Sequence, residues 1–298
     1  MFKHYIQAAR LRTLPLSVSG IIVGSALAWY DGYKNYSIFI LAVLTTIGFQ
    51  IISNFANDYG DGVKGTDNEK RIGPKRAIQS GVITPKQMKK AISISLISTL
   101  IFALLLIYVA FGAENIRYSI LFVFLGILSI AAAIKYTVGK KAYGYSGFGD
   151  VFVFIFFGLL STIGSYFLYT KNLDLKVIYP AITVGLLSVA VLNLNNMRDI
   201  TNDKLAGKNT LVVKFGKKNA VIYHTMLIVI SLISVLVFTC NFTNKPLAYL
   251  YLIAYIPLTI HVIKVWKIKH EKDFDPELKK VALSTFLFSI LFAAGLLF

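Results

Sequence analysis

The chain of 298 residues is 56% hydrophobic and 15% charged, with a mean hydropathy of +0.66. This composition excludes a water-soluble globular domain, because most side chains must face lipid or other apolar helices. The formal net charge of +17 comes from 31 Lys and Arg against 14 Asp and Glu. Since these cations are spread along a hydrophobic chain, they indicate membrane topology and not nucleic-acid binding.

Nine apolar runs follow one another along the chain, each about as long as the roughly 17 to 25 residues that cross a bilayer core. They cover residues 14–30, 37–56, 90–112, 117–135, 148–169, 176–197, 218–240, 246–264 and 280–298. The alternation of polar and apolar residues that marks a membrane β-barrel is absent from them. We therefore predict an all-α integral membrane protein with nine transmembrane helices, in which residues 1–298 form a single domain.

The cations are distributed unevenly over the segments between these runs. The amino-terminal segment and the second, fourth, sixth and eighth loops hold 26 of the 31 Lys and Arg. Because Lys and Arg are retained on the cytoplasmic side, we predict a multi-pass protein of the cell (cytoplasmic) membrane. Its amino terminus would lie in the cytoplasm and its carboxyl terminus outside. The first run follows Arg10 and Arg12 as in a signal peptide, but its length favours an uncleaved helix.

A first polar stretch follows the second run and contains Asn57, Asp58, Asp61 and Asp67. If the second helix continues through it, Asn54 and the first three of these residues lie on one helical face. Cations follow at once, at Lys64, Lys70, Arg71, Lys75 and Arg76. Carboxylates beside cations suit a metal-bridged diphosphate, since hard cations such as Mg²⁺ take oxygen ligands from carboxylates and phosphates. By composition alone, a solvated loop whose opposite charges pair with each other fits equally well.

A second polar stretch follows the sixth run, where Asn195, Asp199 and Asp203 recur at a spacing of four residues. This spacing places them in one column of a helix, and carboxylates one turn apart repel without a shared counter-ion. Arg198 and Lys204 are the local alternatives to a metal ion. Downstream, Gly207-Lys208-Asn209-Thr210 supplies a turn and a cation suited to phosphate. Both stretches fall on the predicted cytoplasmic side.

The remaining reactive side chains carry little signal. Cys240 is the single cysteine, so it cannot form an intrachain disulfide, and we expect it to pack at a helix end. The four histidines, His4, His224, His261 and His270, show no metal-ligand spacing. We expect them at the membrane interface or in solvent.

The two stretches resemble the motifs of the UbiA superfamily of intramembrane prenyltransferases, and within it the 1,4-dihydroxy-2-naphthoate polyprenyltransferase (MenA) branch. The resemblance covers essentially the whole chain. It rests on the pattern N-x-x-N-D-Y-x-D-x-x-K-G-x-D at residues 54–67, on residues 71–84, on residues 136–150, and on D-x-x-x-D-x-x-x-G-K-x-T-L within residues 195–216. In many superfamily members the second aspartate of the first motif stands four residues after the first, at the position that is Gly65 in this chain. Here that aspartate is Asp67 instead, which favours the naphthoate branch over the 4-hydroxybenzoate branch. The fourth loop has Lys140-Lys141-Ala142 where prolines are common.

The resemblance implies a fold and a reaction. The fold would be nine helices around a central cavity that opens sideways to lipid and is capped by cytoplasmic loops. The reaction would be transfer of a polyprenyl group from a polyprenyl diphosphate to an aromatic acid. In this branch the acceptor also loses its carboxyl group, so that the products are demethylmenaquinone of the menaquinone pathway, diphosphate and carbon dioxide.

The resemblance also implies roles for individual residues. Asp61, Asp67, Asp199 and Asp203 would be the catalytic ligands of Mg²⁺, with Asp58 a further ligand or a residue that orients one. Asn57 and Asn195 would bind metal or phosphate through their amides. The phosphate-binding cations would be Lys64, Arg71, Arg76, Lys140 and Lys208. Tyr136 and Tyr143 would offer an aromatic face or a hydrogen bond to the substrates, with structural packing as the alternative for either.

Other functions remain open from the sequence. A sister enzyme could use the same metal chemistry on 4-hydroxybenzoate or homogentisate. A cation transporter would also carry intramembrane carboxylates, but along an ion path, whereas the acids here cluster at one membrane face. A purely structural membrane protein has no use for two matched acidic motifs.

Overall fold

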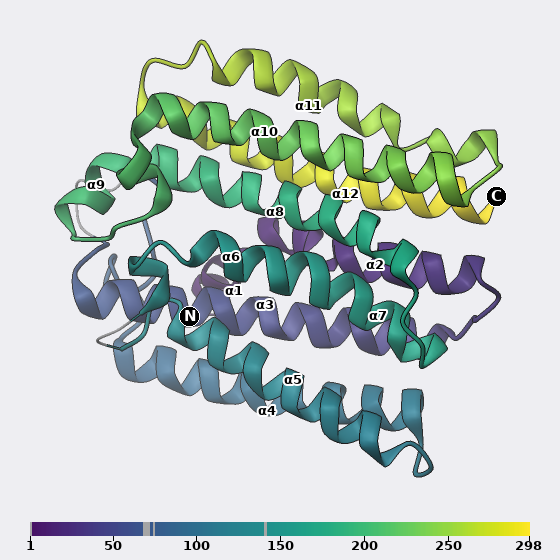
Figure 1. Cartoon of the computed structure of the whole chain (residues 1–298). Coiled ribbons are helices and arrows are strands. Elements are labelled where there is room, and N and C mark those ends of the chain that lie inside the picture. The colour runs from purple at the N-terminus through teal and green to yellow at the C-terminus, as the bar shows by residue number, and fades with distance from the viewer. Residues whose placement is uncertain (1, 68–71, 74, 140–141) are drawn as a thin grey trace.

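The structure is a computed structural model that describes residues 2–67, 72–73, 75–139 and 142–298. The described residues form α-helices with short helical turns between them, and no strand is found among them. The α-helices are α1 (Phe2–Ala9), α2 (Leu14–Tyr30), α3 (Tyr36–Lys64), α4 (Pro85–Phe111), α5 (Ile116–Lys135), α6 (Gly149–Val153), α7 (Ser161–Thr170), α8 (Ile178–Arg198), α9 (Ile200–Leu205), α10 (Leu211–Phe242), α11 (Leu252–Val265) and α12 (Asp275–Leu297). Figure 1 shows the long helices running side by side as a bundle.

Within the described parts of the chain, nine helical segments are long and apolar enough to cross a membrane. These are Lys3–Tyr30, Tyr36–Lys64, Pro85–Phe111, Ile116–Lys135, Gly149–Thr170, Leu175–Arg198, Leu211–Phe242, Pro246–Val265 and Glu271–Leu297. They correspond one to one with the nine predicted runs. The predicted all-α membrane fold with nine spans is therefore confirmed.

Local sequence explains where several spans begin. Asn35 caps α3, because its side-chain oxygen accepts hydrogen bonds from the backbone N–H groups of Ser37 and Ile38 at 3.0 and 3.2 Å. Thr84 and Gln87 form a capping box at the start of α4, with Pro85 in the first turn. Both devices satisfy backbone N–H groups that the first turn of a helix leaves unpaired.

The fifth span, Gly149–Thr170, is continuous although its hydrogen-bond pattern changes. α6 and α7 are joined by a π-helical segment, Phe154–Leu160, that contains Gly158. A Cβ atom at Gly158 would lie 2.5 Å from the Cα atom of Gly185 in α8. Two facing glycines thus bring these helices into backbone contact, which is a common way of packing helices in membranes.

Helices α4 and α5 lie at one edge of the bundle (Figure 1) and pack on α3. Exposed isoleucines recur along α4 at Ile94, Ile97 and Ile101, and along α5 at Ile116, Ile120 and Ile127. This helical spacing gives each helix an apolar outer face for lipid. The main buried core lies elsewhere, where α2, α7, α8, α10 and α12 pack together.

Two of the four histidines contradict the expectation that they lie in solvent or at the interface. His224 and His261 are buried, with Nε2 atoms 2.8 Å apart, where α10 meets α11. His261 Nδ1 lies 2.7 Å from a carboxylate oxygen of Glu277 in α12. Lys264 and Lys280 contact the other oxygen of Glu277 at 2.7 and 2.8 Å. This network gives both ring nitrogens of His261 and both oxygens of Glu277 a partner, as buried polar groups require.

Candidate functional site

The first acidic stretch lies on the last turns of α3, because that helix continues past the apolar run to Lys64 and ends at Gly65 in the left-handed conformation. Gly60 and Gly62 lie within the helix rather than interrupting it. A Cβ atom at Gly60 would come within 2.5 Å of Thr137, and one at Gly62 within 2.7 Å of Ile78. These glycines therefore let the fourth and second loops pack closely against α3.

Arg76 joins the two carboxylates of the first motif. Its Nη1 atom lies 2.5 Å from Asp61 Oδ2 and 3.0 Å from Asp67 Oδ2, and it also donates to the carbonyl of Asn57 at 2.9 Å. Both aspartates are buried. Burial alone would lower the pKa of Arg76, but the charges of Asp61 and Asp67 outweigh burial and raise it. A cation thus sits between two carboxylates that would otherwise repel each other.

Asp58 binds the backbone of the second loop. Its two carboxylate oxygens accept the backbone N–H groups of Ala77 and Ile78 at 3.1 and 3.2 Å. These bonds fasten the turn after Arg76 to α3. These two bonds fit the orienting role that was one of the two expected for Asp58, and the metal-ligand role stays a prediction. The nearby Asn57 accepts a hydrogen bond from Thr137 through its side-chain oxygen at 3.2 Å.

Arg198 organises the second acidic stretch. It donates from Nε and Nη2 to the two oxygens of Asp199 at 3.0 and 2.6 Å. It also donates to Asn195 Oδ1 at 2.8 Å and pairs with Asp275 of α12 at 2.5 Å. Arg198 is only 2% exposed. The intrahelical ion pair that the sequence left open as an alternative is therefore present and holds Asp199 in place.

Asp203, one turn further on in α9, has a different environment. Its Oδ1 atom lies 3.4 Å from Lys208 Nζ, while its Oδ2 atom is buried without a hydrogen-bond partner among the described residues. Burial raises the pKa of Asp203 to about 6; the charge of Lys208 opposes that rise, and those of Asp199 and Asp61 add to it. Burial would lower the pKa of Lys208, but Asp203 raises it, so this lysine remains charged.

The two acidic stretches meet although they lie far apart in the sequence. The side-chain amide of Asn202 in α9 donates to the backbone carbonyl of Thr66 at 3.1 Å. Both groups are buried, so the bond links the second loop directly to the second motif. The end of α3 and α9 lie at the same end of the bundle (Figure 1). Asp61, Asp67, Asp199 and Asp203 are thereby gathered at one end of the protein.

Tyr145 of the fourth loop completes this junction. Its hydroxyl lies 2.7 Å from Asp61 Oδ1 and 2.6 Å from Thr66 Oγ1. The ammonium group of Lys64 lies 4.1 Å from the centre of its ring. Tyr145, Thr66 and Asn202 were not among the predicted site residues. Tyr145 could have been found from the sequence, because it belongs to the Tyr143-Gly144-Tyr145 segment on which the family resemblance partly rests. The prediction chose Tyr143 from that segment instead.

The two predicted tyrosines have different surroundings. Tyr143 donates its hydroxyl to the carbonyl of Ala132 at 2.8 Å and stacks on Phe152 with ring centres 3.9 Å apart, which is a packing role. Tyr136 lies against Tyr143, with ring centres 5.3 Å apart. Burial raises the pKa of Tyr136 to about 12, with the nearby charge of Lys208 opposing the rise. Tyr136 therefore stays neutral beside a site cation.

Two predicted phosphate-binding residues, Arg71 and Lys140, lie outside the described residues.

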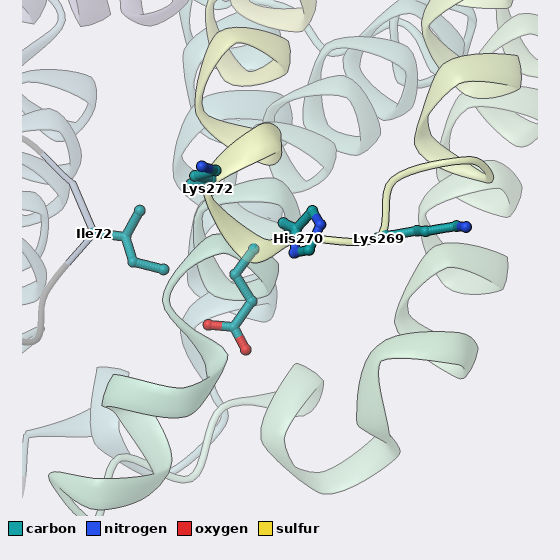
Figure 2. Close-up of a pocket in the computed structure, with 5 residues that line it drawn as sticks. Ile72, Lys269, His270 and Lys272 are labelled. Carbon is teal, nitrogen blue, oxygen red and sulfur yellow. The ribbon is translucent and has the colours of Figure 1, made fainter.

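A separate surface pocket of about 500 Å³ is lined by Ile72, Lys269, His270, Glu271 and Lys272. In Figure 2, Ile72 faces the turn that carries His270 and Lys272. Glu271 accepts a hydrogen bond from Thr201 of α9 at 2.6 Å. This pocket therefore borders the second motif but is not lined by any of the predicted acidic residues.

The donor set can be tested against Mg²⁺ directly. Among the described residues, no group of three or more His, Cys, Asp or Glu stands close enough to form a ready-made metal cage. Mg²⁺ usually binds through only one or two carboxylates, and its other ligands are water and substrate phosphates. The buried, unpartnered Oδ2 of Asp203 and the nearby Asp61 carboxylate supply oxygen donors of that kind. The residues therefore fit a magnesium ion that arrives together with a diphosphate.

The chain matches the UbiA prenyltransferase family over residues 17–295. It is 42% identical to the 1,4-dihydroxy-2-naphthoate octaprenyltransferase of Haemophilus influenzae, over 99% of this chain and 96% of that protein. It is also 42% identical to the enzyme of the same name from Escherichia coli, over 98% of this chain and 94% of that protein.

Solved structures agree with the fold. A UbiA homologue from Aeropyrum pernix superposes with a TM-score of 0.70 at 15% identity, covering 96% of this chain and 97% of that one. A UbiA homologue from Archaeoglobus fulgidus, solved with DMAPP and Mg²⁺ bound, superposes with a TM-score of 0.60 at 13% identity, covering 97% of this chain and 99% of that one. The family match spans nearly the whole chain and the relatives are similar over nearly their full length. The chain therefore belongs to the UbiA prenyltransferase family.

Proposed function

We propose that this protein transfers a polyprenyl group from a polyprenyl diphosphate to 1,4-dihydroxy-2-naphthoate, a reaction of menaquinone biosynthesis. The observation that carries the proposal is the Asn202–Thr66 hydrogen bond of 3.1 Å, which brings the two acidic motifs together. The naphthoate acceptor is supported by the names of two relatives at 42% identity. Loss of the acceptor carboxyl group as carbon dioxide, giving demethylmenaquinone, is part of the same proposal.

Cleavage of the allylic C–O bond leaves positive charge on the prenyl group and negative charge on the departing diphosphate. Mg²⁺ held by Asp61, Asp67, Asp199 and Asp203 would neutralise that negative charge as a Lewis acid. The requirement for Mg²⁺ is supported by the Archaeoglobus fulgidus homologue that was solved with this ion and DMAPP. Asp199 accepts two hydrogen bonds from Arg198. Because a carboxylate has about four acceptor positions, Asp199 keeps further lone pairs that could bind a metal ion.

The protein's own cations have a second task. Arg76 and Lys208 pair with carboxylates in this structure. On substrate binding, their N–H groups would donate hydrogen bonds to phosphate oxygens instead. Lys64, which is exposed beside them, would join them, and so would Arg71 and Lys140 of the neighbouring loops. Asn57 and Asn195 would offer amide groups to metal or phosphate. Charge-assisted hydrogen bonds of this kind stabilise the leaving group where its charge develops.

Tyr136 would face the prenyl cation or the acceptor. Its ring lies beside Gly144 and Gly149, and Lys208 and Asp61 are close enough to act on its hydroxyl electrostatically. A neutral aromatic ring can stabilise a passing carbocation without reacting with it. Tyr143 supports Tyr136 through its packing. The side chains around this junction are largely buried, which would keep water away from the carbocation.

The charge distribution supports placing this site on the cytoplasmic face of the cell membrane. Of the 31 Lys and Arg, 26 lie in the amino-terminal segment and the even-numbered loops, which include both acidic motifs. The amino terminus would then be cytoplasmic and the carboxyl terminus outside, with the whole chain forming one domain. Gathering of the acids at this end also disfavours the cation-transporter alternative, which needs carboxylates along a path through the membrane.

The test is an assay of the purified protein with labelled polyprenyl diphosphate and a panel of acceptors, with Mg²⁺ or with EDTA. We expect Mg²⁺-dependent prenylation of 1,4-dihydroxy-2-naphthoate, with one carbon dioxide released per product from acceptor labelled in its carboxyl group. Preferential use of 4-hydroxybenzoate or homogentisate would overturn the acceptor assignment. Failure to consume the diphosphate with any acceptor would overturn the reaction. Asp174→Asn is a control that should remain active, because Asp174 lies between α7 and α8, whose connection is at the end of the bundle away from α9 (Figure 1).

A further inference from the structure

Tyr145 of the fourth loop contacts both of the other loops of the proposed site. Its hydroxyl meets Asp61 and Thr66 of the first motif and second loop, at 2.7 and 2.6 Å. Its backbone carbonyl accepts the N–H of Asn209, beside Lys208 of the sixth loop, at 2.9 Å. Tyr145 itself belongs to the fourth loop.

The direction of these hydrogen bonds follows from their chemistry. An ionised carboxylate only accepts hydrogen bonds, so the Tyr145 hydroxyl must donate to Asp61. A hydroxyl carries one hydrogen, so Thr66 must in turn donate to the Tyr145 oxygen. The two hydrogen bonds therefore form a series in which Thr66 donates to Tyr145 and Tyr145 donates to Asp61. Thr66 is itself tied to the second motif, because its carbonyl accepts the amide of Asn202 at 3.1 Å.

Tyr145 and Arg76 divide the Asp61 carboxylate between them. Tyr145 occupies Oδ1 and Arg76 occupies Oδ2. If Arg76 turned toward a phosphate, Oδ2 would become available to a metal ion, and the bond from Tyr145 would still fix the plane of the carboxylate.

The ring of Tyr145 has a separate role. Lys64 Nζ lies 4.1 Å and Lys208 Nζ 5.9 Å from the ring centre. Cations within about 6 Å of an aromatic ring are attracted by its quadrupole when they lie over its face. The ring thus holds two phosphate-binding candidates from different loops close to Asp61.

We propose that Tyr145 is a positioning residue for prenyl transfer, whose hydroxyl orients Asp61 toward the metal ion and whose ring holds Lys64 and Lys208 for the diphosphate. The proposal rests on the function assigned above and adds a residue to it. It predicts two separable contributions from one side chain. Loss of the hydroxyl should raise the Mg²⁺ concentration that the enzyme needs, and loss of the ring should in addition lower the affinity for diphosphate.

The experiment compares Tyr145→Phe, Tyr145→Leu and a matched control. Tyr166→Phe serves as that control, because the Tyr166 hydroxyl also donates to an aspartate at 2.7 Å, at Asp31 near the end of α2. Each variant is measured for the Mg²⁺ concentration that gives half-maximal rate, for the KM of the prenyl diphosphate, and for its unfolding midpoint. Binding of inorganic pyrophosphate with Mg²⁺ to the enzyme, without acceptor, is measured by calorimetry.

We expect Tyr145→Phe to raise the half-saturating Mg²⁺ concentration about tenfold, the effect of one hydrogen bond to a charged group. Its kcat at saturating Mg²⁺ should approach that of the unmodified enzyme. Tyr145→Leu should in addition weaken pyrophosphate binding, and Thr66→Val should change the Mg²⁺ requirement in the same direction but less. Tyr166→Phe should change neither quantity.

Unaltered Mg²⁺ dependence and pyrophosphate affinity in Tyr145→Phe would overturn the proposal. So would a loss of activity that merely follows a lower unfolding midpoint and is not reversed by Mg²⁺. If Tyr145→Leu does not fold, Tyr145→Phe and Thr66→Val still decide the question. The pyrophosphate measurement needs no prenyl acceptor, so failure of the proposed reaction and failure of the Tyr145 role give different results.

Discussion

Replacement of Arg76 by Gln is the perturbation whose consequence can be worked out most fully from the structure. Arg76 contacts Asp61 and Asp67 at 2.5 and 3.0 Å, and these aspartates are 4% and 8% exposed. Glutamine would leave two buried carboxylates beside each other without this cation. Removal of one partner from a buried ion pair costs about 3–5 kcal/mol. Because Tyr145 and Lys208 still stabilise Asp61, we expect the lower end, about 3 kcal/mol.

The assay is thermal unfolding of the purified protein in detergent. In EDTA, a loss of about 3 kcal/mol corresponds to an unfolding midpoint lowered by roughly 5 °C for a chain of this size. Added Mg²⁺ should restore much of this loss in Arg76→Gln, because a divalent ion can replace the missing guanidinium between the carboxylates. The unmodified protein should gain less from Mg²⁺ alone.

Arg117→Gln is the matched control, since Arg117 is exposed at the start of α5. It should unfold within about 1 °C of the unmodified protein, as expected for an exposed charge away from ion pairs. The reasoning is refuted if Arg76→Gln and Arg117→Gln unfold at the same temperature in EDTA. It is also refuted if Mg²⁺ raises both midpoints equally.

Four further outcomes are expected. Asp61→Asn and Asp203→Asn should each reduce prenyl transfer more than about a hundredfold while leaving the elution volume in size-exclusion chromatography unchanged, because an amide cannot replace a carboxylate that neutralises metal charge. Removal of divalent ions by EDTA should abolish transfer, and added Mg²⁺ should restore it; activity that persists in EDTA would contradict the metal site. Gly158→Ala should destabilise the protein by about 1–3 kcal/mol in thermal unfolding, because its Cβ would lie 2.5 Å from a backbone atom of α8, whereas Gly126→Ala, with no atom within 4 Å, should not. Cys240 is exposed near the carboxyl end of α10, an end that lies away from α9 in the bundle (Figure 1), and it should react with a membrane-impermeant maleimide added outside intact cells; labelling only after the cells are opened would contradict the predicted topology.

The fold was largely predictable because hydrocarbon imposes strong rules on a chain. Each span must be helical and about as long as the bilayer is thick, so composition and length locate it. Hydropathy ended the second span at residue 56, but α3 continues to Lys64. Hydropathy locates the part of a helix that lies in lipid and does not locate the end of the helix. Here α3 continues past its apolar part and carries the polar motif on its last turns. The π-helical segment at Phe154–Leu160 was not predictable either, because it accompanies the contact between Gly158 and Gly185 of two different helices.

The site was predictable where it depends on local spacing. Helical periodicity placed Asn195, Asp199 and Asp203 together, and the structure has Asn195 in α8, Asp199 at the junction of α8 and α9, and Asp203 in α9. Partners from distant segments were not predictable. Asp58 binds backbone groups of Ala77 and Ile78, which no side-chain pattern reveals.

The same limit explains the tyrosines and the histidines. Tyr143 and Tyr145 lie on one short turn, and only the folded loop shows that Tyr145 reaches Asp61 while Tyr143 packs on Phe152. His224 and His261 are buried because Glu277 of a third helix completes their network. Sequence spacing carries no information about partners that come from separate helices.

The most direct test is a structure of the protein with Mg²⁺ and a non-hydrolysable prenyl thiolodiphosphate. The account predicts one diphosphate lying between the two acidic motifs, with metal ions contacting carboxylates from both, Asp61 or Asp67 on one side and Asp199 or Asp203 on the other. It also predicts that Arg76 leaves Asp61 to contact the phosphate. A diphosphate bound by one motif alone, or bound elsewhere with Arg76 still between the two aspartates, would contradict it.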